Sequence, residues 1–414
     1  MAESVTTLTA DWLIDGAGGA PLRSPSVAVV GDRIKKIGST AAGAKPPAGW
    51  NFPGCTILPG LIDAHVHLTF AALKTHEEVV RLVSGESESE LTARAIANAQ
   101  AALRYGITTV RDCGGPHLAT IIVRDAIRRG SVLGPDILAC GRPITTRNGH
   151  LHYIGILGDT AAEVQSAAER LMASHEKADF LKIIATGGNM TAGSNRFACQ
   201  YDAPSLRACV EVGRKLGVHT AAHVLSPCAI GPCIEAGVRT IEHCSWRVSE
   251  ERHCFDPNLA RKLVANGQYV GFTMTAPTWR KVVPGMSGVD AKLIGDLDER
   301  FETERRTIEA GVKHLLHTDA GVRQTPFGPS LALGAHAAVH ELRLTPMEAI
   351  LAITHNAAEA IGLADRGVVQ AGKRADLLVV EGNPLTDMGA LLRVEAVFRG
   401  GNLVWRANPG RGQG

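Results

Sequence analysis

The feature that most constrains this chain is an alternation in its middle 300 or so residues, where short apolar runs are followed by stretches with helical spacing. Repeated strand-then-helix units predict a parallel sheet covered by helices. The helical stretches are rich in Ala, Glu and Arg, as in residues 88–104. The candidate strands are 56–65 (TILPGLIDAH), 107–114 (ITTVRDCG), 136–142 (DILACGR), 180–188 (FLKIIATGG), 218–223 (VHTAAH), 239–243 (RTIEH), 268–275 (QYVGFTMT) and 312–321 (VKHLLHTDAG).

Eight such units predict an α/β fold built on a closed (β/α)₈ barrel of the TIM type, over residues 58–364. A doubly wound open sheet is the alternative, but no G-x-G-x-x-G follows an early strand. The two ends of the chain read as short strands broken by Gly, Asp and Pro. We expect residues 1–57 and 365–414 to join in one small β-sandwich beside the barrel.

Polar residues stand where several of the predicted strands end, which is where a barrel of this kind carries its chemistry. His65 and His67 form an H-x-H pair whose side chains point to one face of a strand, so both imidazoles can reach one metal ion. An H-x-H pair taken by itself is equally well explained as two polar residues that follow the end of a strand into solvent. The other strand-end residues are Lys182, His223, His243 and Asp319.

Each of these residues alone has an ordinary explanation. A single strand-end histidine is more often hydrogen-bonded and structural, and an Asp before Ala-Gly often caps a turn. Lys182 within an apolar strand is less ordinary, because an uncompensated buried ammonium is costly. Six such coincidences at strand ends are hard to accept together, so we interpret the group as a metal-ligand set.

Composition narrows the function classes. The formal net charge is +2, with no long run of one sign, so we expect neither a nucleic-acid partner nor a membrane surface. No apolar stretch approaches the roughly 20 residues that span a bilayer, and no secretory signal is evident. The nine scattered cysteines lack a C-x-x-C pair, which favours reduced thiols in a cytoplasmic protein over a disulfide framework.

The sequence resembles the metal-dependent amidohydrolase superfamily, in particular its imidazolonepropionase-like branch, which includes Xaa-Pro dipeptidases (prolidases). The resemblance covers nearly the whole chain and implies a (β/α)₈ barrel flanked by a β-sandwich. The matching motifs are GLIDAHVH (60–67), YGITTVRDCGG (105–115), LKIIATGG (181–188), AAH (221–223), AGVRTIEH (236–243), HTDAG (317–321), ITHNAAEAIGL (353–363) and GVVQAGKRADLLVVEGNPL (367–385).

Carried over by motif, the resemblance implies a site for two divalent metal ions, zinc in the first instance. His65, His67 and Asp319 would hold one ion, and His223 and His243 the other. Lys182 would bridge the two as a carboxylated lysine, whose negative charge two cations stabilise. The resemblance also implies a symmetric homo-oligomer.

Two local features leave alternatives open. His219 shares the β alternation of His223, so the pattern alone does not exclude it as the ligand, although His223 gives the spacing of the family. The segment after this strand contains Pro227 and Pro232, where the crossover helix normally has no interior proline. That helix either starts late or is kinked.

With such a site, we expect hydrolysis of an amide C–N bond in a small molecule. Asp319 is the expected general base, taking a proton from the attacking water and giving it to the leaving nitrogen. His150, in the loop after the third strand, is the candidate for stabilising the oxyanion, with His152 as the alternative. Both can equally be ordinary loop histidines.

The expected substrates are N-acyl amino acids or dipeptides. Arg323 and Arg196 are the candidates for binding a carboxylate, because an arginine fork donates two parallel hydrogen bonds. Bulky aryl amides, carbamates or ochratoxin-like amides are the alternative, with an aryl pocket lined by some of Phe70, Trp246, Phe272, Trp279 and Phe327.

Activities of other classes also fit part of the pattern. A mononuclear deaminase of the superfamily would use a glutamate, and Glu242 precedes His243, but such enzymes lack the lysine that stands here at Lys182. A phosphotriesterase-like activity is chemically open to a two-metal site. A non-catalytic scaffold would have lost ligands, and here every position is filled.

Overall fold

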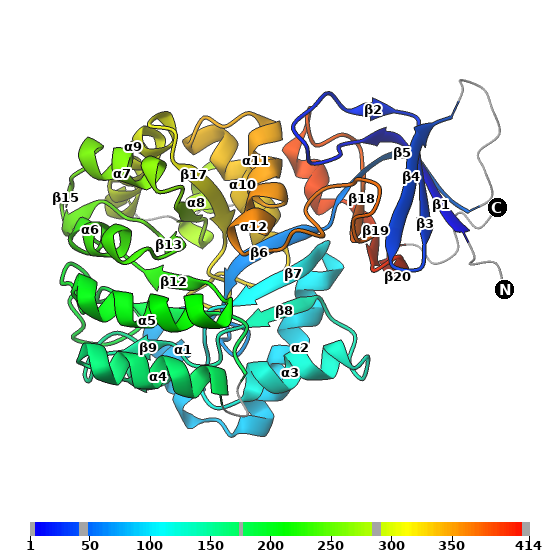
Figure 1. The fold of residues 1–414 in the computed structure, drawn as a ribbon. Coiled ribbons are helices and arrows are strands. Elements are labelled where there is room, and N and C mark those ends of the chain that lie inside the picture. The colour runs from blue at the N-terminus through cyan, green and yellow to red at the C-terminus, as the bar shows by residue number, and fades with distance from the viewer. Residues whose placement is uncertain (1–4, 41–48, 174–176, 284–290, 408–414) are drawn as a thin grey trace.

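The computed structural model describes residues 5–40, 49–173, 177–283 and 291–407, and Figure 1 shows them as an α/β fold with two sheet regions. Strands from the middle of the chain lie among helices. Strands from both ends, drawn in dark blue and red, lie side by side at one edge of the molecule.

All eight predicted central strands are present, and every neighbouring pair among them is parallel. They fall into two sheets, ordered β6-β7-β8 and β10-β9-β11-β12-β13-β16-β17. The strands are β6 (Leu61–Val66), β7 (Ile107–Asp112), β8 (Asp136–Ala139), β9 (Ile144–Thr145), β10 (Ile156–Leu157), β11 (Leu181–Ile184), β12 (Thr220–His223), β13 (Thr240–Glu242), β16 (Tyr269–Thr273) and β17 (Lys313–His317).

The two central sheets are joined at their edges by backbone hydrogen bonds. The Asp319 amide donates to the His65 carbonyl at 2.9 Å, and Val66 and Ala320 form a parallel bridge. At the other edge, the Asp179 amide donates to the Ala139 carbonyl at 2.9 Å. The ends of β6 and β17, which are more than 250 residues apart in the chain, therefore lie together.

Several of the helices begin at residues whose side chains cap them. Three of them have a complete capping box, with Thr75, Ser87 and Thr345 as N-caps. The crossover helix α6 starts at Pro227 and contains Pro232, so it forms despite an interior proline. The helices are α1 (His76–Gly85), α2 (Glu88–Arg104), α3 (Ala119–Arg128), α4 (Ala161–Ala173), α5 (Ala203–Leu216), α6 (Pro227–Ala236), α7 (Pro257–Ala265), α8 (Ala276–Val282), α9 (Ala291–Glu309), α10 (Pro329–Glu341), α11 (Pro346–Ala352) and α12 (His355–Ala360).

Strands from both ends of the chain form one sheet, ordered β20-β19-β18-β5-β1-β3-β4, with β2 paired to β1. The apolar run at 55–66, predicted as a single strand up to His65, is two strands in different sheets, separated at Gly60. A Cβ at Gly60 would lie 2.2 Å from the Thr108 hydroxyl, so no larger residue fits where the chain changes sheets. The strands are β1 (Val5–Leu13), β2 (Leu22–Arg23), β3 (Pro25–Val30), β4 (Arg33–Ser39), β5 (Trp50–Pro59), β18 (Leu377–Glu381), β19 (Val394–Arg399) and β20 (Asn402–Arg406); a 3₁₀ helix, η1 (Met388–Leu392), lies between β18 and β19.

An ionic cluster links the terminal sheet to the central strands. Asp136 at the start of β8 accepts hydrogen bonds from three arginines, Arg366, Arg374 and Arg399. Burial alone raises the pKa of a carboxyl group, but the three guanidinium groups hold the pKa of Asp136 far below its ordinary value.

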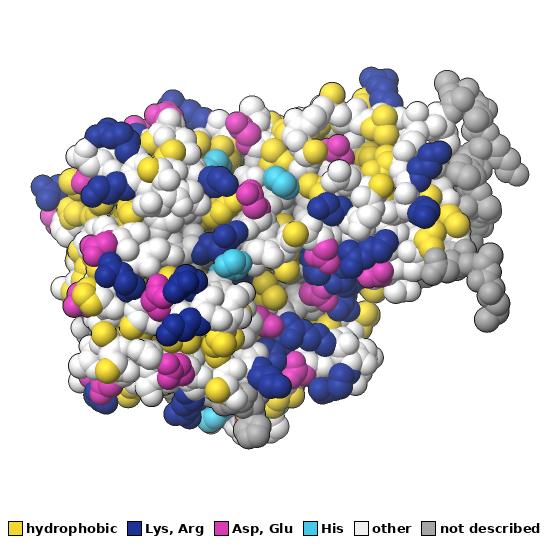
Figure 2. All heavy atoms as spheres, in the orientation of Figure 1, with side chains coloured by type: hydrophobic (Ala, Val, Ile, Leu, Met, Phe, Trp, Pro, Cys, Tyr) yellow, Lys and Arg dark blue, Asp and Glu magenta, His cyan; other side chains and the backbone are white. Residues whose placement is uncertain are grey.

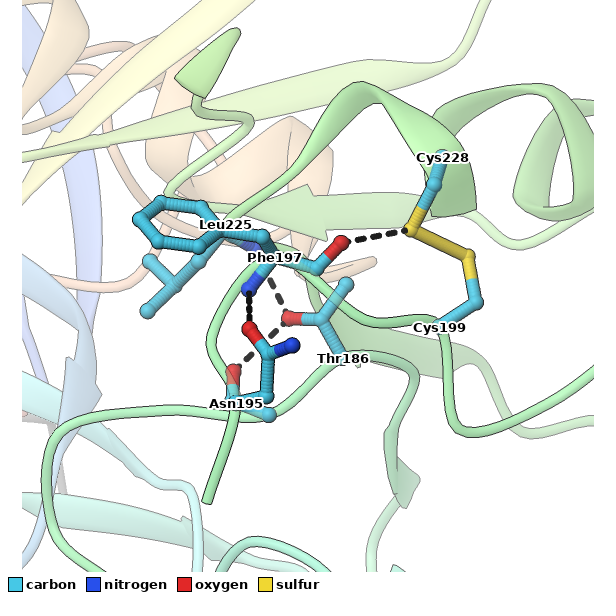
Figure 3. Close-up of a disulfide and its surroundings, with 7 residues drawn as sticks. Thr186, Asn195, Phe197, Cys199, Leu225 and Cys228 are labelled. Carbon is cyan, nitrogen blue, oxygen red and sulfur yellow. Dashed lines mark hydrogen bonds between the residues drawn. A yellow bond between two sulfur atoms is a disulfide. The ribbon is translucent and has the colours of Figure 1, made fainter. Parts of the chain in front are cut away.

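The nine cysteines are not all reduced thiols, contrary to the expectation from sequence. Cys199 and Cys228 form a disulfide across 29 residues of chain, and the other seven are free. Figure 3 shows this bond between the loop that follows β11 and the first turn of α6.

The face of the molecule in Figure 2 carries Lys and Arg side chains interspersed with Asp and Glu. No helix among the described residues has the length and apolarity needed to span a bilayer.

Candidate metal centre and substrate cavity

His65, His67 and Asp319 lie together where β6 and β17 end. The Asp319 Oδ1 atom is 3.5 Å from Nε2 of His65 and 3.3 Å from Nε2 of His67. Asp319 and His243 both have left-handed backbone conformations, with φ of 57° and 67°. Such conformations cost of order 1 kcal/mol in a residue with a side chain, and they occur where the surrounding structure fixes a functional side chain.

Three of the histidines are held from behind by their outer ring nitrogens. Nδ1 of His65 is 3.1 Å from Glu242, and Nδ1 of His67 is 2.7 Å from the Gly114 carbonyl. Nδ1 of His243 is 2.6 Å from the Thr273 hydroxyl. In each case Nε2 is left for the interior, which is how metal-binding histidines are oriented by outer partners.

Lys182 is 1% exposed in the middle of β11, and its Nζ has no hydrogen-bond partner among the described residues. Nε2 of His243 also lacks one. Buried polar groups are nearly always hydrogen-bonded, so unpartnered atoms at one site indicate an absent ligand. His65, His243 and Asp319 bring ligand atoms within 4.8 Å of one another. These residues therefore fit a divalent metal ion.

His223 ends β12 inside the same group, with its ring centroid 4.6 Å from that of His243 and 4.8 Å from that of His150. The alternative residue, His219, precedes β12 at the other end of the strand, where its ring lies against Gly362. The structure thus brings His223, and not His219, to the candidate site.

A buried ionic network lies beneath the histidines. Arg111 donates to Glu242 at 2.6 Å, and both side chains are almost fully buried. Burial raises the pKa of a carboxyl group, but Arg111 and further positive neighbours lower the pKa of Glu242 to about 2. Glu242 is therefore a fixed anion behind His65.

His317 is a buried member of this group that sequence reasoning did not single out. Its Nε2 is 3.5 Å from Glu242 and 3.2 Å from the Gly271 carbonyl. The H-x-D spacing of His317 and Asp319 has the same alternation as the H-x-H pair, and that signal was available in the sequence.

The protonation states suit metal ligands. Burial lowers the pKa values of His65, His223 and His243 well below the ordinary histidine value, so these rings are neutral near pH 7. Burial raises the pKa of Asp319, but the combined effect of His67, His317 and Lys182 outweighs burial and lowers the pKa. His65, His223 and His243 are therefore neutral imidazoles beside a carboxylate, whereas Asp319 raises the pKa of His67 in spite of its burial.

A cavity of about 460 Å³ opens above this group. Of the predicted residues, His150, His223, His243, Asp319, Arg196 and Arg323 line it. His152 is not among the lining residues; its Nδ1 is 2.9 Å from the Gly149 carbonyl at an exposed position. None of the five aromatic residues predicted for an aryl pocket lines this cavity either.

Several lining residues were not predicted. His76, Asn189, Met190, Ser245, Arg247, His253 and Arg300 also face the cavity. His76 is the first residue of α1 and Arg300 lies on α9. The others come from loops and from the β14 (Arg247–Ser249) and β15 (Arg252–His253) hairpin, whose paths no periodic sequence pattern reveals.

The two predicted arginines differ in their surroundings. Arg196 pairs with Glu250 and also donates to Asn189 at 3.2 Å. The Arg323 guanidinium has no hydrogen bond or ion pair with any of the described side chains, although its charge acts on Glu77. Arg323 is thus a cavity arginine that is not engaged in an ion pair.

Comparison with known proteins places these features in a family. The sequence profile of the amidohydrolase family matches residues 56–404. Ochratoxinase from Aspergillus niger is 27% identical, covering 96% of this chain and 86% of its own length, and imidazolonepropionase from Mycolicibacterium smegmatis is 24% identical, covering 96% of each chain. The crystal structure of a Xaa-Pro dipeptidase with methionine bound in its active site superposes with a TM-score of 0.80 at 26% identity, covering 97% of this chain and 100% of that one.

Proposed function

Since the chain belongs to the amidohydrolase family, in its imidazolonepropionase-like branch, and is therefore a hydrolase of C–N bonds in small molecules, we propose that it cleaves amide bonds of N-acyl amino acids or dipeptides with two divalent metal ions. The observation that carries this proposal is the convergence of the Nε2 atoms of His65 and His67 on Asp319, with the outer ring nitrogens already hydrogen-bonded.

The proposed architecture is a closed (β/α)₈ barrel over residues 58–364, flanked by a small β-sandwich from residues 1–57 and 365–414. The parallel strand pairs and the bridge between Val66 and Ala320 support closure on one side, and the Asp179–Ala139 hydrogen bond supports it on the other. The shared sheet of β1–β5 with β18–β20 supports the second domain.

In the proposed site, His65, His67 and Asp319 would hold one ion, and His223 and His243 would hold the other. Carboxylated Lys182 would be a ligand shared by both, which would give its buried and unpartnered Nζ a role that a bare ammonium beside two cations does not have. Imidazole and carboxylate ligands suit zinc.

Bound divalent ions at such a site acidify a water molecule and polarise the scissile carbonyl group. The chain's own contribution starts with Asp319, a carboxylate of low pKa that lines the cavity. Asp319 accepts a proton from the attacking water and returns it to the leaving nitrogen. Its Oδ1 atom lies 3.3 Å from Nε2 of His67 and 3.5 Å from Nε2 of His65, beside the proposed metal ligands.

His150 is proposed to stabilise the oxyanion. It lines the cavity beside His223, and burial lowers the pKa of its ring to about 3, so it is a neutral donor near pH 7. A neutral imidazole can donate one N–H to the developing charge without a change in protonation. His152 lies outside the cavity, and we do not propose a role for it.

Arg323 is proposed to bind the carboxylate of the substrate, because among the described residues it is the cavity arginine that has no ion-pair partner, whereas Glu250 already neutralises Arg196. A planar guanidinium can donate two parallel hydrogen bonds to a carboxylate. Substrates with a free carboxylate next to the scissile amide are therefore favoured over neutral aryl amides or carbamates.

Among the other chemistries, a mononuclear deaminase is disfavoured by the position of Glu242. Its carboxylate is engaged by Arg111, Thr240 and His65 and is not free to carry protons. We also propose that the protein is cytoplasmic and forms a homo-oligomer. The seven free cysteines support the cytoplasmic location. The Cys199–Cys228 bond is the feature that does not follow from that location.

The substrate proposal is tested with matched pairs of N-acyl amino acids and their C-terminal amides, assayed with wild type, Arg323→Ala and Arg196→Ala. We expect wild type to prefer the free acids. Arg323→Ala should raise KM for the acids at least tenfold and leave the amides unchanged, and Arg196→Ala should have a smaller effect. Equal KM values for acids and amides in wild type would contradict carboxylate recognition.

A further inference from the structure

A second pair of histidines lies outside the cavity, on helix α10. His336 and His340 are four residues apart, so their side chains lie one above the other on the same face of the helix. Their Nε2 atoms are 3.2 Å apart, and the rings are nearly parallel, with centroids 5.1 Å apart. Neither residue lines the cavity described above.

We propose that His336 and His340 form a peripheral chelating site for one divalent transition-metal ion of the Zn²⁺ or Ni²⁺ type. Bonds from zinc to imidazole nitrogen are about 2.0–2.1 Å long, so two nitrogens on one ion are about 2.9 Å apart at a right angle and about 3.4 Å apart at a tetrahedral angle. The observed separation of 3.2 Å lies between these limits. The pair is already spaced as a chelate.

In the absence of an ion, one imidazole donates its Nε2 proton to the other. Binding the ion requires that this proton move to Nδ1 of the same ring, so both rings stay neutral and no proton is lost. The remaining adjustment is a rotation of the ring about χ2, which is a soft torsion in histidine. The backbone of α10 does not have to move.

The surroundings of His336 and His340 favour a partly hydrated cation bound at the surface. His336 is partly buried and His340 is exposed, so water can complete the coordination. Asp387, at the N-cap of η1, is the acidic group whose charge acts on His336, although it also pairs with Arg393 at 2.7 Å. Imidazole ligands select zinc, nickel or copper over calcium or magnesium.

The test is a titration of the holoenzyme with Zn²⁺, after its resident metal has been counted by elemental analysis. We expect wild type to bind one further ion per chain, and His336→Ala and His340→Ala each to weaken that binding at least tenfold. His355→Ala, which removes an exposed histidine of α12, is the matched control and should bind as wild type does.

The C–N hydrolase activity should be the same in all four proteins, because neither histidine of the pair contacts the cavity. Indistinguishable Zn²⁺ titrations of wild type and both α10 variants would overturn the proposal. Since the metal of the proposed catalytic site is counted before the titration begins, failure of that site and failure of this one give different results.

Discussion

The Oε2 atom of Glu242 lies 3.1 Å from Nδ1 of His65, and its Oε1 atom lies 2.6 Å from Arg111. One buried carboxylate thus both fixes the ring of a candidate metal ligand and neutralises a buried arginine. Because an anion on Nδ1 orients the ring and makes Nε2 more basic, Glu242 belongs to the metal site without touching a metal.

Glu242→Gln is therefore expected to weaken metal binding about 10- to 100-fold. Glutamine keeps the volume but removes the charge that His65 and Arg111 share. The measurement is competition for metal with a chelator. Glu304→Gln, which removes another buried carboxylate that pairs with Arg300, is the control and should keep the wild-type metal affinity. Equal affinities in wild type and Glu242→Gln would show that the contact has no such role.

Asp319→Asn is expected to abolish turnover while the protein stays folded. Asparagine keeps the size and shape of the side chain beside His67 and His65, but its amide cannot take up and return a proton. A loss of at least about 10²-fold in kcat is expected from removal of a general base, with a much smaller change in metal content. An Asp319→Asn protein that binds metal normally and turns over at the wild-type rate would exclude the proton-transfer role.

Asp136→Asn is expected to destabilise the protein by ~2 kcal/mol at pH 7, because three arginines lose their shared anion in a largely buried place. The pKa of Asp136 is lower in the folded protein than in the unfolded chain, where it is about 4. Its contribution to the free energy of unfolding is therefore fully present above about pH 4 and is lost as the pH falls further. Urea unfolding of wild type and Asp136→Asn should converge in acid.

The matched control for that series is Glu211→Gln, which breaks an exposed pair with Arg214 on α5. Solvent screens such a pair, so the variant should unfold like wild type at every pH. A difference between wild type and Asp136→Asn that stays constant down to acid pH would mean that the charge of Asp136 is not what stabilises the junction.

Reduction of the Cys199–Cys228 bond is expected to raise KM severalfold with little change in kcat. The bond ties the loop after β11 to α6 (Figure 3), and Asn189, Met190 and Arg196 of that loop line the cavity. Thiol titration should show two additional thiols after reduction. Cys199→Ser and Cys228→Ser should reproduce the effect, and Cys254→Ser, at an exposed free thiol, should not. An unchanged KM in the fully reduced protein would show that the bond does not hold the cavity loop in place.

The central strands and their terminal residues were predictable because buried parallel strands read as apolar runs. A His, Lys or Asp within such a run is costly to bury unless it has a partner, so it stands out. His65, Lys182 and Asp319 were recognised in this way. The break at Gly60 was not, because the apolar run continues across it while the chain passes from one sheet to another. His317 carried a readable spacing that was overlooked.

The walls of the cavity were much less predictable. Arg196 and Arg323 were both named from sequence, but only the folded loops show that Glu250 neutralises the first. His152 has the same residue type and nearly the same position as His150, yet its ring turns to the Gly149 carbonyl outside the cavity. The disulfide joins cysteines 29 residues apart with no spacing motif, so it depends on the fold that brings the loop after β11 to the start of α6.

A metal pair that shares Lys182 can be counted by elemental analysis of wild type and Lys182→Ala purified in parallel, with His336→Ala in both backgrounds so that the α10 pair does not add to the count. We expect about two divalent ions per chain with Lys182 present and a clear loss in Lys182→Ala. One ion per chain that is unaffected by Lys182→Ala would exclude the shared lysine and favour a mononuclear site.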